Sequence, residues 1–479
     1  MLTEQVQTML ENDRQVGAQL VEKWSRMPGN RLRGYSNLKE VNFMEGLEHK
    51  QDAAMMVASL YENALKQLRS LDETTRMLQV GSFEKFVFPI IRAVFANLVA
   101  SEWVTTQALT APTGLVFFMD AIYGTQKGNI NRGDKVFDAL TGPSTDTHYT
   151  DEVVSEEAIG TGDGATANYT GNLAHIPVRP GTVRITDGTQ VVVDNGNGAL
   201  VGDVNALGTN TINYATGAYD VTFTANVVNA TAITASYEYN LEANADIPEM
   251  DLILTSAPVT ARPHKLRARW SIEAQQDFQA YHGINAEVEL VAFMANEISK
   301  EINYKIRAHL QSIAAAGSVT WDRTPDTGVP WIWHKESLYD AFVQASNFIF
   351  AATQRREATY FICGVNVCNV VETLSKFKSA GNNAKAAAGV RKIGTLGEFT
   401  IYKDPTMDAD SFVGGFKGSN FLDTGYIYAP YQGLYTTQLI VLDDMIARKA
   451  MAQRVGLKVV NPNFYVTGSV TQSGGAFVA

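Results

Sequence analysis

The most regular pattern of apolar residues in this chain predicts one long helix near its middle. Apolar side chains recur at every fourth position, with glutamate and lysine between them. The members of this stripe are Leu290, Met294, Ile298, Ile302, Ile306 and Leu310. Because residues four apart lie on one helix face, we expect residues 270–316 to be helical, with a break at His282-Gly283. The stripe is expected to face a sheet, with Glu297 and Lys300 toward solvent or neighbouring subunits.

Helical spacing also occurs in the first 80 residues, on both sides of a break at Pro28-Gly29. The apolar positions are Val6, Met9, Leu10, Val16 and Leu20, and then Met55, Met56, Leu60, Leu65, Leu68 and Leu71. We interpret this region as a helical arm. Its ten basic and eleven acidic residues nearly cancel, which disfavours a nucleic-acid-binding tail. We expect its stripe, with Trp24, to be buried on a neighbouring subunit.

Strand-like patterning with turn dipeptides fills residues 144–246. The strand segments are 182–186, 190–193, 212–214, 219–223 and 233–239, and the turns are Asp187-Gly188, Asn195-Gly196 and Thr216-Gly217. In the last segment Ile233, Ala235, Tyr237 and Tyr239 alternate with polar residues, which is typical of a half-buried strand. A small β-sandwich or partial barrel is therefore expected, with its two chain ends close together.

The remaining segments mix both kinds of element. A Pro-Thr-Gly turn at residues 112–114 leads into what we expect to be a short buried strand. Helices are expected at residues 338–352 and 367–377, and strands at 394–402, 412–416, 426–429 and 457–460. The fold class predicted from these patterns is α+β.

Charge separates the strand-rich block from the rest. Between Lys135 and Arg262 there is no lysine and there are only two arginines, against 16 acidic residues, which gives a net formal charge of −14. The whole chain carries −11, so the remainder is close to neutral. A change of charge and of periodicity at the same places indicates a module inserted into a host domain.

Composition places the chain among globular proteins. At 479 residues and 45% apolar it can bury a large core. No stretch approaches the roughly 18 apolar residues that span a bilayer, and residues 1–7 have no signal-peptide pattern. We expect a protein made and folded in a cytoplasm, without membrane contact.

The chemistry-bearing residues form no recognisable catalytic, cofactor-binding or metal-binding set. Cys363 and Cys368 have neither redox nor zinc spacing and are expected to be buried and reduced. The seven histidines are scattered along the chain, and we expect each to be either hydrogen-bonded within the fold or exposed to solvent. The glycine-rich residues 160–165 are expected to form a turn, and residues 194–203, which lack calcium-loop spacing, a hairpin.

Several stretches resemble the major capsid proteins of T-even-like tailed bacteriophages, whose shell subunit has the Hong Kong 97-type fold. The stretches are residues 89–104, 107–117, 266–283, 297–303, 413–418, 425–431 and 454–462. They occur in the expected order. The chain is thus identified as a member of that family.

The resemblance implies a division of the chain. The expected parts are an N-terminal helical arm at 1–82, an entry segment and the start of an extended loop at 83–143, an inserted β domain at 144–246, a peripheral domain with a spine helix at 247–330, an axial domain at 331–445, and C-terminal strands returning to the peripheral domain at 446–479. The insert is expected on the outer shell surface. Relatives often lose an N-terminal propeptide after a glutamate, and residues 43–46 match that motif approximately, so removal of the arm stays open.

The function implied is that of a non-enzymatic major capsid protein assembling as homo-hexamers into an icosahedral head around double-stranded DNA. Its implied partners are vertex, portal, scaffold and decoration proteins, with only non-specific contact to the DNA. The implied location is the virion, after the host cytoplasm. The alternatives are a pentameric vertex paralogue, an encapsulin-type shell protein, and a carbohydrate-binding or adhesive protein in which Tyr214, Tyr219, Tyr237 and Tyr239 stack on sugars.

Overall fold

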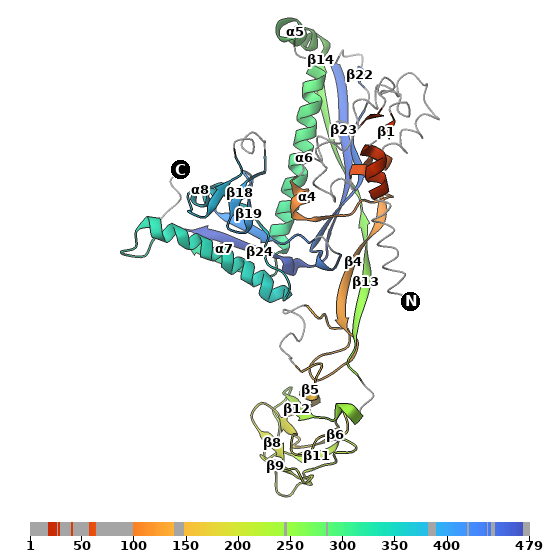
Figure 1. The fold of residues 1–479 in the computed structure, drawn as a ribbon, viewed down its shortest axis with the longest axis vertical. Helices are drawn as coiled ribbons and strands as arrows, with labels where there is room; N and C mark the ends of the chain where they lie inside the picture. Colours follow the sequence, from red (N-terminus) through yellow and green to blue (C-terminus); the bar gives the residue numbers. More distant parts are fainter. Residues whose placement is uncertain are drawn as a thin grey trace. The chain divides into compact units, whose positions relative to one another are not determined.

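The computed structural model divides the chain into two compact units. Unit 1 comprises Met1–Met119 and Leu254–Ala479, and unit 2 comprises Asp120–Ile253. The structure describes residues 18–25, 27–28, 40–41, 57–63, 99–137, 148–243, 247–283, 286–381, 389–418, 421–437, 439–441 and 446–472. Figure 1 shows helices and sheets together in unit 1, which agrees with the predicted α+β class.

A sheet of long strands supports the spine helix α6 (Ala286–Ile313) in unit 1. Its order is β14 (Arg262–Ser271), β23 (Ile446–Val459), β21 (Tyr426–Thr436) and β3 (Thr105–Thr106), and β22 (Ile440–Val441) also pairs with β23. Strands β14 and β23 are antiparallel. Lys449 of β23 pairs with Glu287 of α6 at 2.6 Å.

The predicted helical stripe is confirmed. Five of its members, from Met294 to Leu310, are buried in one hydrophobic cluster with side chains of β21 and β23, whereas Leu290 is half-buried. Glu297 and Lys300 lie on the exposed side and form an ion pair of 2.5 Å. The apolar face of α6 is therefore the face that packs on the sheet.

The predicted break before the spine helix is also confirmed, but the helical region begins later than expected. Helix α5 (Ile272–His282) ends at Gly283, which has a left-handed φ of 64°. Residues 270 and 271 belong to β14 because Trp270 and Ser271 continue the ladder with Ala447 and Ile446. Ser271 is the N-cap of α5, since its side chain accepts a hydrogen bond from the Ala274 backbone at 3.2 Å.

A second sheet of unit 1 has seven strands. Its order is β15 (Ser318–Asp322), β24 (Tyr465–Thr471), β20 (Ser411–Gly415), β16 (Tyr360–Cys363), β19 (Phe399–Lys403), β18 (Arg391–Leu396) and β17 (Phe377–Ser379). Helices α7 (Trp331–Thr353) and α8 (Val365–Val371) share its hydrophobic cluster. Cys363 and Cys368 lie in this cluster as buried free thiols, as predicted.

Three expectations for this region were wrong in their bounds. Helix α7 begins at Trp331, directly after Pro330, rather than at residue 338. Helix α8 ends at Val371, and Phe377 begins a strand that pairs with Leu396. The single strand expected at 394–402 is a hairpin of β18 and β19, because Gly397 adopts a left-handed φ of 60° between them.

The C-terminal strands pair with partners from distant segments of the chain. Strand β21, from the segment assigned to the axial domain, pairs with β23 beside the spine helix. Strand β24 pairs with β15, from the segment expected in the peripheral domain, and with β20, from the segment expected in the axial domain. Strand pairing depends on partners distant in sequence, which periodicity does not identify.

Unit 2 contains a β-sandwich of two sheets (Figure 1). One sheet has the order β10 (Thr211–Ile212), β11 (Ala218–Thr222) and β6 (Asn168–Asn172). The other has β5 (Val153–Thr161), β12 (Ala232–Glu238), β7 (Arg184–Thr186), β8 (Val191–Asp194) and β9 (Leu200–Gly202). Both sheets contribute to one core, which confirms the predicted sandwich.

The predicted turns and chain ends of the sandwich are confirmed. Val153 pairs with Glu238, so the first and last strands lie side by side. The loop after Asp194 joins β8 to β9 as a hairpin, with Gly196 at φ 82°. In the glycine-rich segment the Asp163 carboxylate accepts hydrogen bonds from the backbone of Ala165 and Thr166, which makes a turn.

The strand after the Pro-Thr-Gly turn differs from its prediction. Strand β4 (Thr113–Tyr123) has 11 residues rather than a few, and Val116 is its one fully buried side chain. It pairs with β13 (Met250–Thr260), and the division between the two units falls within both strands. The short helix α4 (Ala100–Trp103) precedes it. Short 3-10 helices occur at Leu241–Ala243, Phe421–Asp423 and Pro462–Phe464.

The described pieces of the N-terminal segment pack within the chain, contrary to the expectation for Trp24. Residues 18–25 and 57–63 are helical, and β1 (Met27–Pro28) pairs with β2 (Glu40–Val41). Trp24 and Tyr61 are fully buried, with ring centroids 4.9 Å apart, and Leu20 packs against the same cluster as the spine helix. Apart from Leu20 and Leu60, the positions of the expected arm stripe, and residues 43–46, lie outside the described residues.

Candidate assembly surfaces

Three of the described histidines link different helices and strands through hydrogen bonds. His264 bonds Glu301 at 3.1 Å, His309 bonds Tyr426 at 2.8 Å, and His334 bonds the Asp322 carbonyl at 2.8 Å. Within the described ranges no three His, Cys, Asp or Glu side chains come together at a spacing suited to a metal ion. In the same ranges no helix has the length and hydropathy to cross a bilayer. Several large apolar side chains of the described residues are exposed.

Helix α5 lacks a buried face. Of its 11 residues none is buried, yet it is capped at both ends by Ser271 and Gly283. Two aromatic side chains, Phe278 and Tyr281, are 49% and 82% exposed. They are three positions apart and therefore lie on one side of the helix. Figure 1 shows α5 at the end of α6 that is remote from the seven-stranded sheet of unit 1.

The first turns of α6 continue this exposure. Val288 and Phe293 are 53% and 66% exposed, whereas Met294 and the stripe after it are buried. We call Phe278, Tyr281, Val288 and Phe293 the aromatic tip. Burial of one such side chain is worth about 1.5–3 kcal/mol, so covering the tip would stabilise a complex substantially.

A second apolar surface lies at the start of α7. Ile332 and Trp333 are 67% and 72% exposed, beside Trp331, which is 37% exposed. We call these three residues the tryptophan patch. It stands on a rigid base, because His334 stacks on Trp321 with centroids 5.2 Å apart and Trp321 Nε1 donates to Ser337 Oγ at 2.9 Å. Sequence reasoning missed this patch. The signal was available, since consecutive large apolar residues in a helix cannot all face one core.

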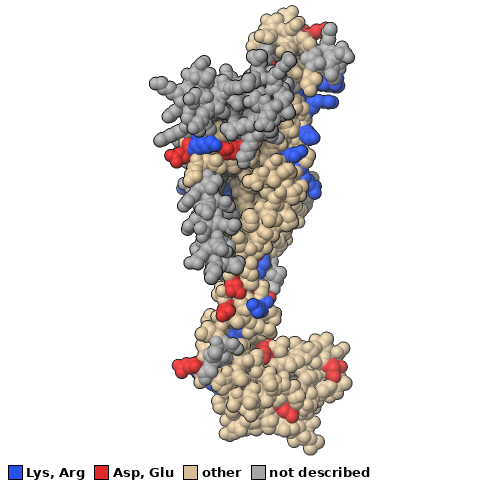
Figure 2. Space-filling view, turned by 90° about the vertical axis from the view of Figure 1, so that its right-hand side faces the viewer, with Lys and Arg blue, Asp and Glu red and all other residues tan. Residues whose placement is uncertain are grey.

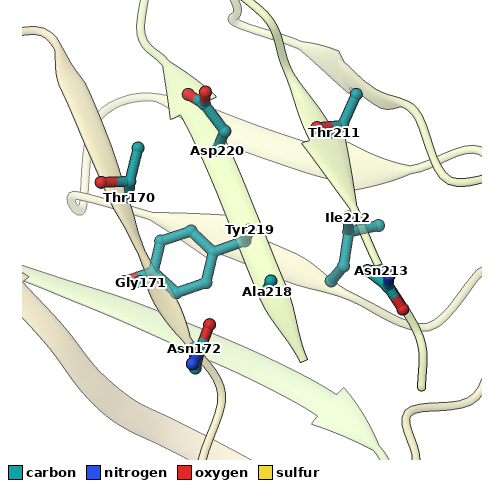
Figure 3. Close-up of a pocket in the computed structure, with 9 residues that line it drawn as sticks. All are labelled: Thr170, Gly171, Asn172, Thr211, Ile212, Asn213, Ala218, Tyr219 and Asp220. Carbon is teal, nitrogen blue, oxygen red and sulfur yellow. The ribbon is translucent and has the colours of Figure 1, made fainter. Parts of the chain in front are cut away.

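Unit 2 has a shallow polar groove on its three-stranded sheet, shown in Figure 3. Its volume is about 590 Å³. It is lined by Thr170, Gly171, Asn172, Thr211, Ile212, Asn213, Ala218, Tyr219 and Asp220, and Tyr219 is only 5% exposed there. A Cβ at position 171 would lie 2.7 Å from the Tyr219 hydroxyl, so glycine leaves room for that ring. The groove presents amides, hydroxyls and one carboxylate.

The tyrosines considered as sugar platforms are mostly interior. Tyr219, Tyr237 and Tyr239 are buried in the sandwich core, and Tyr214 packs against it. The Tyr214 hydroxyl donates to Asp194 at 2.8 Å. Stacking of a sugar on the three buried rings is therefore excluded, and the carbohydrate-binding alternative loses the feature that motivated it.

One carboxylate inside unit 2 is electrostatically perturbed. Burial raises the pKa of Glu157, although the Tyr237 hydroxyl and the Ala174 backbone both donate hydrogen bonds to it. The same burial and the neighbouring carboxylate raise the pKa of Tyr237. The pair joins β5 to β12 inside one sheet, so its role is structural.

Comparison with known proteins agrees with a structural role. The model of the family "Major capsid protein Gp23" matches residues 80–478. The major capsid protein of Vibrio phage KVP40 is 28% identical over 438 residues, covering 82% of this chain and 79% of that protein. That of Enterobacteria phage T4 is 27% identical over 385 residues, covering 73% and 70%.

Solved structures with similarity include phage capsids. The capsid of Myoviridae phage XM1 matches with 11% identity and a TM-score of 0.33, over 49% of this chain and 81% of that one. The capsid of cyanophage P-SCSP1u matches with 12% identity and a TM-score of 0.34, over 49% and 80%. The family match covers most of the chain, from the last residues before the entry segment to the C-terminal strands. This chain therefore belongs to the Gp23 family of major capsid proteins.

Proposed function

We propose that copies of this chain assemble as hexamers that build the icosahedral head of a tailed bacteriophage around its double-stranded DNA. As a member of the Gp23 family the chain is a major capsid protein, a structural subunit that self-assembles into the shell of a virion. Assembly begins in the host cytoplasm, and vertex, portal, scaffold and decoration proteins complete the particle. Contact with the packaged DNA is non-specific, and the subunit has no catalytic role.

The observation that carries this proposal is the exposed helix α5. A helix of 11 residues without a buried face has little stability of its own in water. Its aromatic side chains Phe278 and Tyr281 gain stability only when another surface covers them. In a shell, a neighbouring copy supplies that surface in every position.

The two sheets of unit 1 correspond to the two domains of a Hong Kong 97-type subunit. We assign the sheet of β14, β23, β21 and β3, with α6, to the peripheral domain. The seven-stranded sheet with α7 and α8 is then the axial domain, and the tryptophan patch is its contact surface in the hexamer. Unit 2 is the inserted domain and faces outward, where its acidic character avoids attraction of the genome.

The test is assembly of a subunit whose aromatic tip is polar. Phe278→Ser with Tyr281→Ser should leave a folded subunit, because neither side chain belongs to the core. Electron microscopy should then show few shells, and analytical ultracentrifugation should show subunits or hexamers that do not assemble further. Gln276→Ser with Gln279→Ser is the matched control on the same helix, since these side chains are also exposed.

Polar substitutions in the tryptophan patch test whether this patch forms the contact between subunits of the hexamer. Ile332→Ser with Trp333→Ser should remove hexamers from sedimentation profiles while the thermal melt of the subunit stays unchanged. Wild-type protein that remains monomeric and forms no shells under any condition would contradict the proposed function.

A further inference from the structure

Strand β14 carries a row of basic side chains on one face. Lys265, Arg267 and Arg269 occupy alternate positions and are exposed. Alternate residues of a strand point to the same side, about 6.6 Å apart. The intervening side chains include His264, which contacts Glu301 of α6, and Trp270, which is buried. The basic row therefore lies on the face of the sheet that is turned away from the spine helix.

The neighbouring strand extends this positive surface. In the β14–β23 ladder, Arg269 pairs with Arg448 and Pro263 pairs with Arg454, while Lys265 and Arg267 lie opposite alanines. Arg448 and Arg454 thus share the face of the basic row. We call Lys265, Arg267, Arg269, Arg448 and Arg454 the basic ladder. Figure 2 shows Lys and Arg side chains following one another along one edge of unit 1.

The ladder carries more charge than protection of an edge requires. Strand β14 is an edge strand, and charged residues on an edge prevent another chain from pairing there. Arg448 and Arg454, however, lie on β23, an interior strand with both edges paired. Among the described residues no ion pair involves Lys265, Arg267 or Arg269. The three side chains are available to an anionic partner.

The same chain supplies a surface of opposite charge. The segment between Lys135 and Arg262 has a net formal charge of −14, and most of it belongs to unit 2. Acidic residues that unit 2 exposes are Asp151, Glu156, Asp163, Asp203, Glu242, Glu249 and Asp251. Two copies of the acidic unit 2 placed side by side in a shell would repel each other. An acidic unit 2 beside a basic ladder would instead be attracted to it, and their opposite charges would offset each other.

We propose that the basic ladder of one copy receives the acidic unit 2 of a neighbouring copy in the shell. This inference rests on the proposed function, because it requires copies to lie side by side. Every copy carries both a basic ladder and an acidic unit 2, so in a closed shell every ladder can contact the unit 2 of a neighbouring copy. Two of the three exposed ladder residues, Arg267 and Arg269, are arginines, whose planar guanidinium groups bind carboxylates through paired hydrogen bonds.

The genome is the other polyanion in a head, and the chain charge argues against it as the occupant. The whole chain is −11, so the field of the subunit as a whole opposes a polyanion. An acidic unit of the same chain is present in a one-to-one ratio with the ladder. Single exposed ion pairs contribute little, and the expected effect is on the rate and orientation of association.

The test is charge reversal with rescue in the full-length protein. The ladder variant is Lys265→Glu, Arg267→Glu and Arg269→Glu, and the unit 2 variant is Glu156→Lys, Glu242→Lys and Asp251→Lys. Each should melt like the wild type and form shells at least about tenfold more slowly, as followed by light scattering and electron microscopy. A protein with all six substitutions should regain assembly. The control is Lys305→Glu, Lys378→Glu and Lys392→Glu, which reverses three exposed lysines elsewhere in unit 1 and should assemble normally.

A neutral set keeps the test valid if charge reversal impairs folding. Wild-type assembly should slow as sodium chloride is added, because salt screens the attraction between the ladder and unit 2. The neutral variant, with Lys265→Gln, Arg267→Gln and Arg269→Gln, should lose this dependence. Normal assembly of the ladder variants beside shell-forming wild type would overturn the inference and leave the proposed function intact. Weaker retention of a linear DNA duplex by the ladder variant, without rescue by the unit 2 substitutions, would assign the ladder to the genome instead. Wild-type protein that never forms shells would overturn both proposals.

Discussion

Arg307 of the spine helix donates its Nε to the Asp404 carboxylate at 2.9 Å, and the Asp404 side chain is completely buried. Asp404 follows β19, so this ion pair fastens α6 to the seven-stranded sheet. The carboxylate also accepts hydrogen bonds from the Thr406 backbone at 2.8 Å and its hydroxyl at 2.7 Å. Its lone pairs are well satisfied only while Arg307 is present.

Removal of Arg307 should therefore destabilise the subunit strongly. Arg307→Leu leaves a buried carboxylate without its cation, at an expected cost of about 3–5 kcal/mol in the free energy of unfolding. Chemical denaturation of the unassembled subunit measures it. Lys305→Leu, an exposed change two residues away, should be nearly neutral. Equal midpoints for the two variants would show that the ion pair contributes little.

A charge in the apolar stripe should be equally damaging. Ile302 is 2% exposed in the cluster between α6 and the sheet. Ile302→Asp buries an unpaired carboxylate, at a cost of several kcal/mol, and should give insoluble or unfolded protein. Ala308→Asp places the same charge on the exposed side of α6 and should stay soluble. A normal yield of assembled particles from Ile302→Asp would refute the packing of the stripe.

The N-terminal helix should stabilise the subunit itself. Trp24 is fully buried against Tyr61, so Trp24→Ala should cost about 3–5 kcal/mol in the free energy of unfolding through lost packing. The thermal melt of the unassembled subunit is the measurement. Glu22→Ala changes an exposed residue of the same turn and is the control. A melt unchanged by Trp24→Ala, with failure of assembly alone, would restore the expectation that this helix acts between subunits.

Glu157 should make the stability of unit 2 depend on pH. Its pKa is raised above the ordinary value of 4.5 by burial, so the folded state holds the proton more tightly than the unfolded state. The contribution of this group is fully present below pH 4.5 and is lost as the pH rises through the folded pKa. Glu157→Gln removes that dependence.

The melting temperature of Glu157→Gln minus that of the wild type should thus increase as the pH rises from about 4.5. This difference should become constant above the pKa of Glu157 in the folded state. Differential scanning fluorimetry of the full-length subunit between about pH 4 and 8 measures this difference. Glu156→Gln, at the exposed neighbouring position, should show no such trend. A constant difference across the range would mean that Glu157 titrates alike in the folded and unfolded states.

Local periodicity was sufficient for the spine helix and the sandwich of unit 2. The four-residue stripe from Met294 to Leu310 is buried as predicted because one helix face is set by spacing alone. Alternation at Ile233, Ala235 and Tyr237 likewise identified β12 and its buried side. The resemblance to a capsid family indicated assembly, while the location of the contact surfaces needed the structure.

Other features depended on partners that local patterns do not specify. Strand β14 was missed although His264, Leu266, Ala268 and Trp270 alternate with charged residues, because its register with β23 joins residues 175 to 193 positions apart, from Ser271↔Ile446 to Arg262↔Val455. The helical spacing around Trp24 and Leu20 was visible, but burial within the chain follows from contact with Tyr61 and the spine cluster.

The sequence by itself determined the class of the protein, its long helix, its acidic β insert and its resemblance to a capsid family. The tertiary structure decided that α5 buries none of its residues, that Ile332 and Trp333 stand outside the core, and that five basic side chains share one sheet face. The reason is physical. Spacing fixes the direction of a side chain relative to its own element, whereas exposure depends on which distant element covers that side.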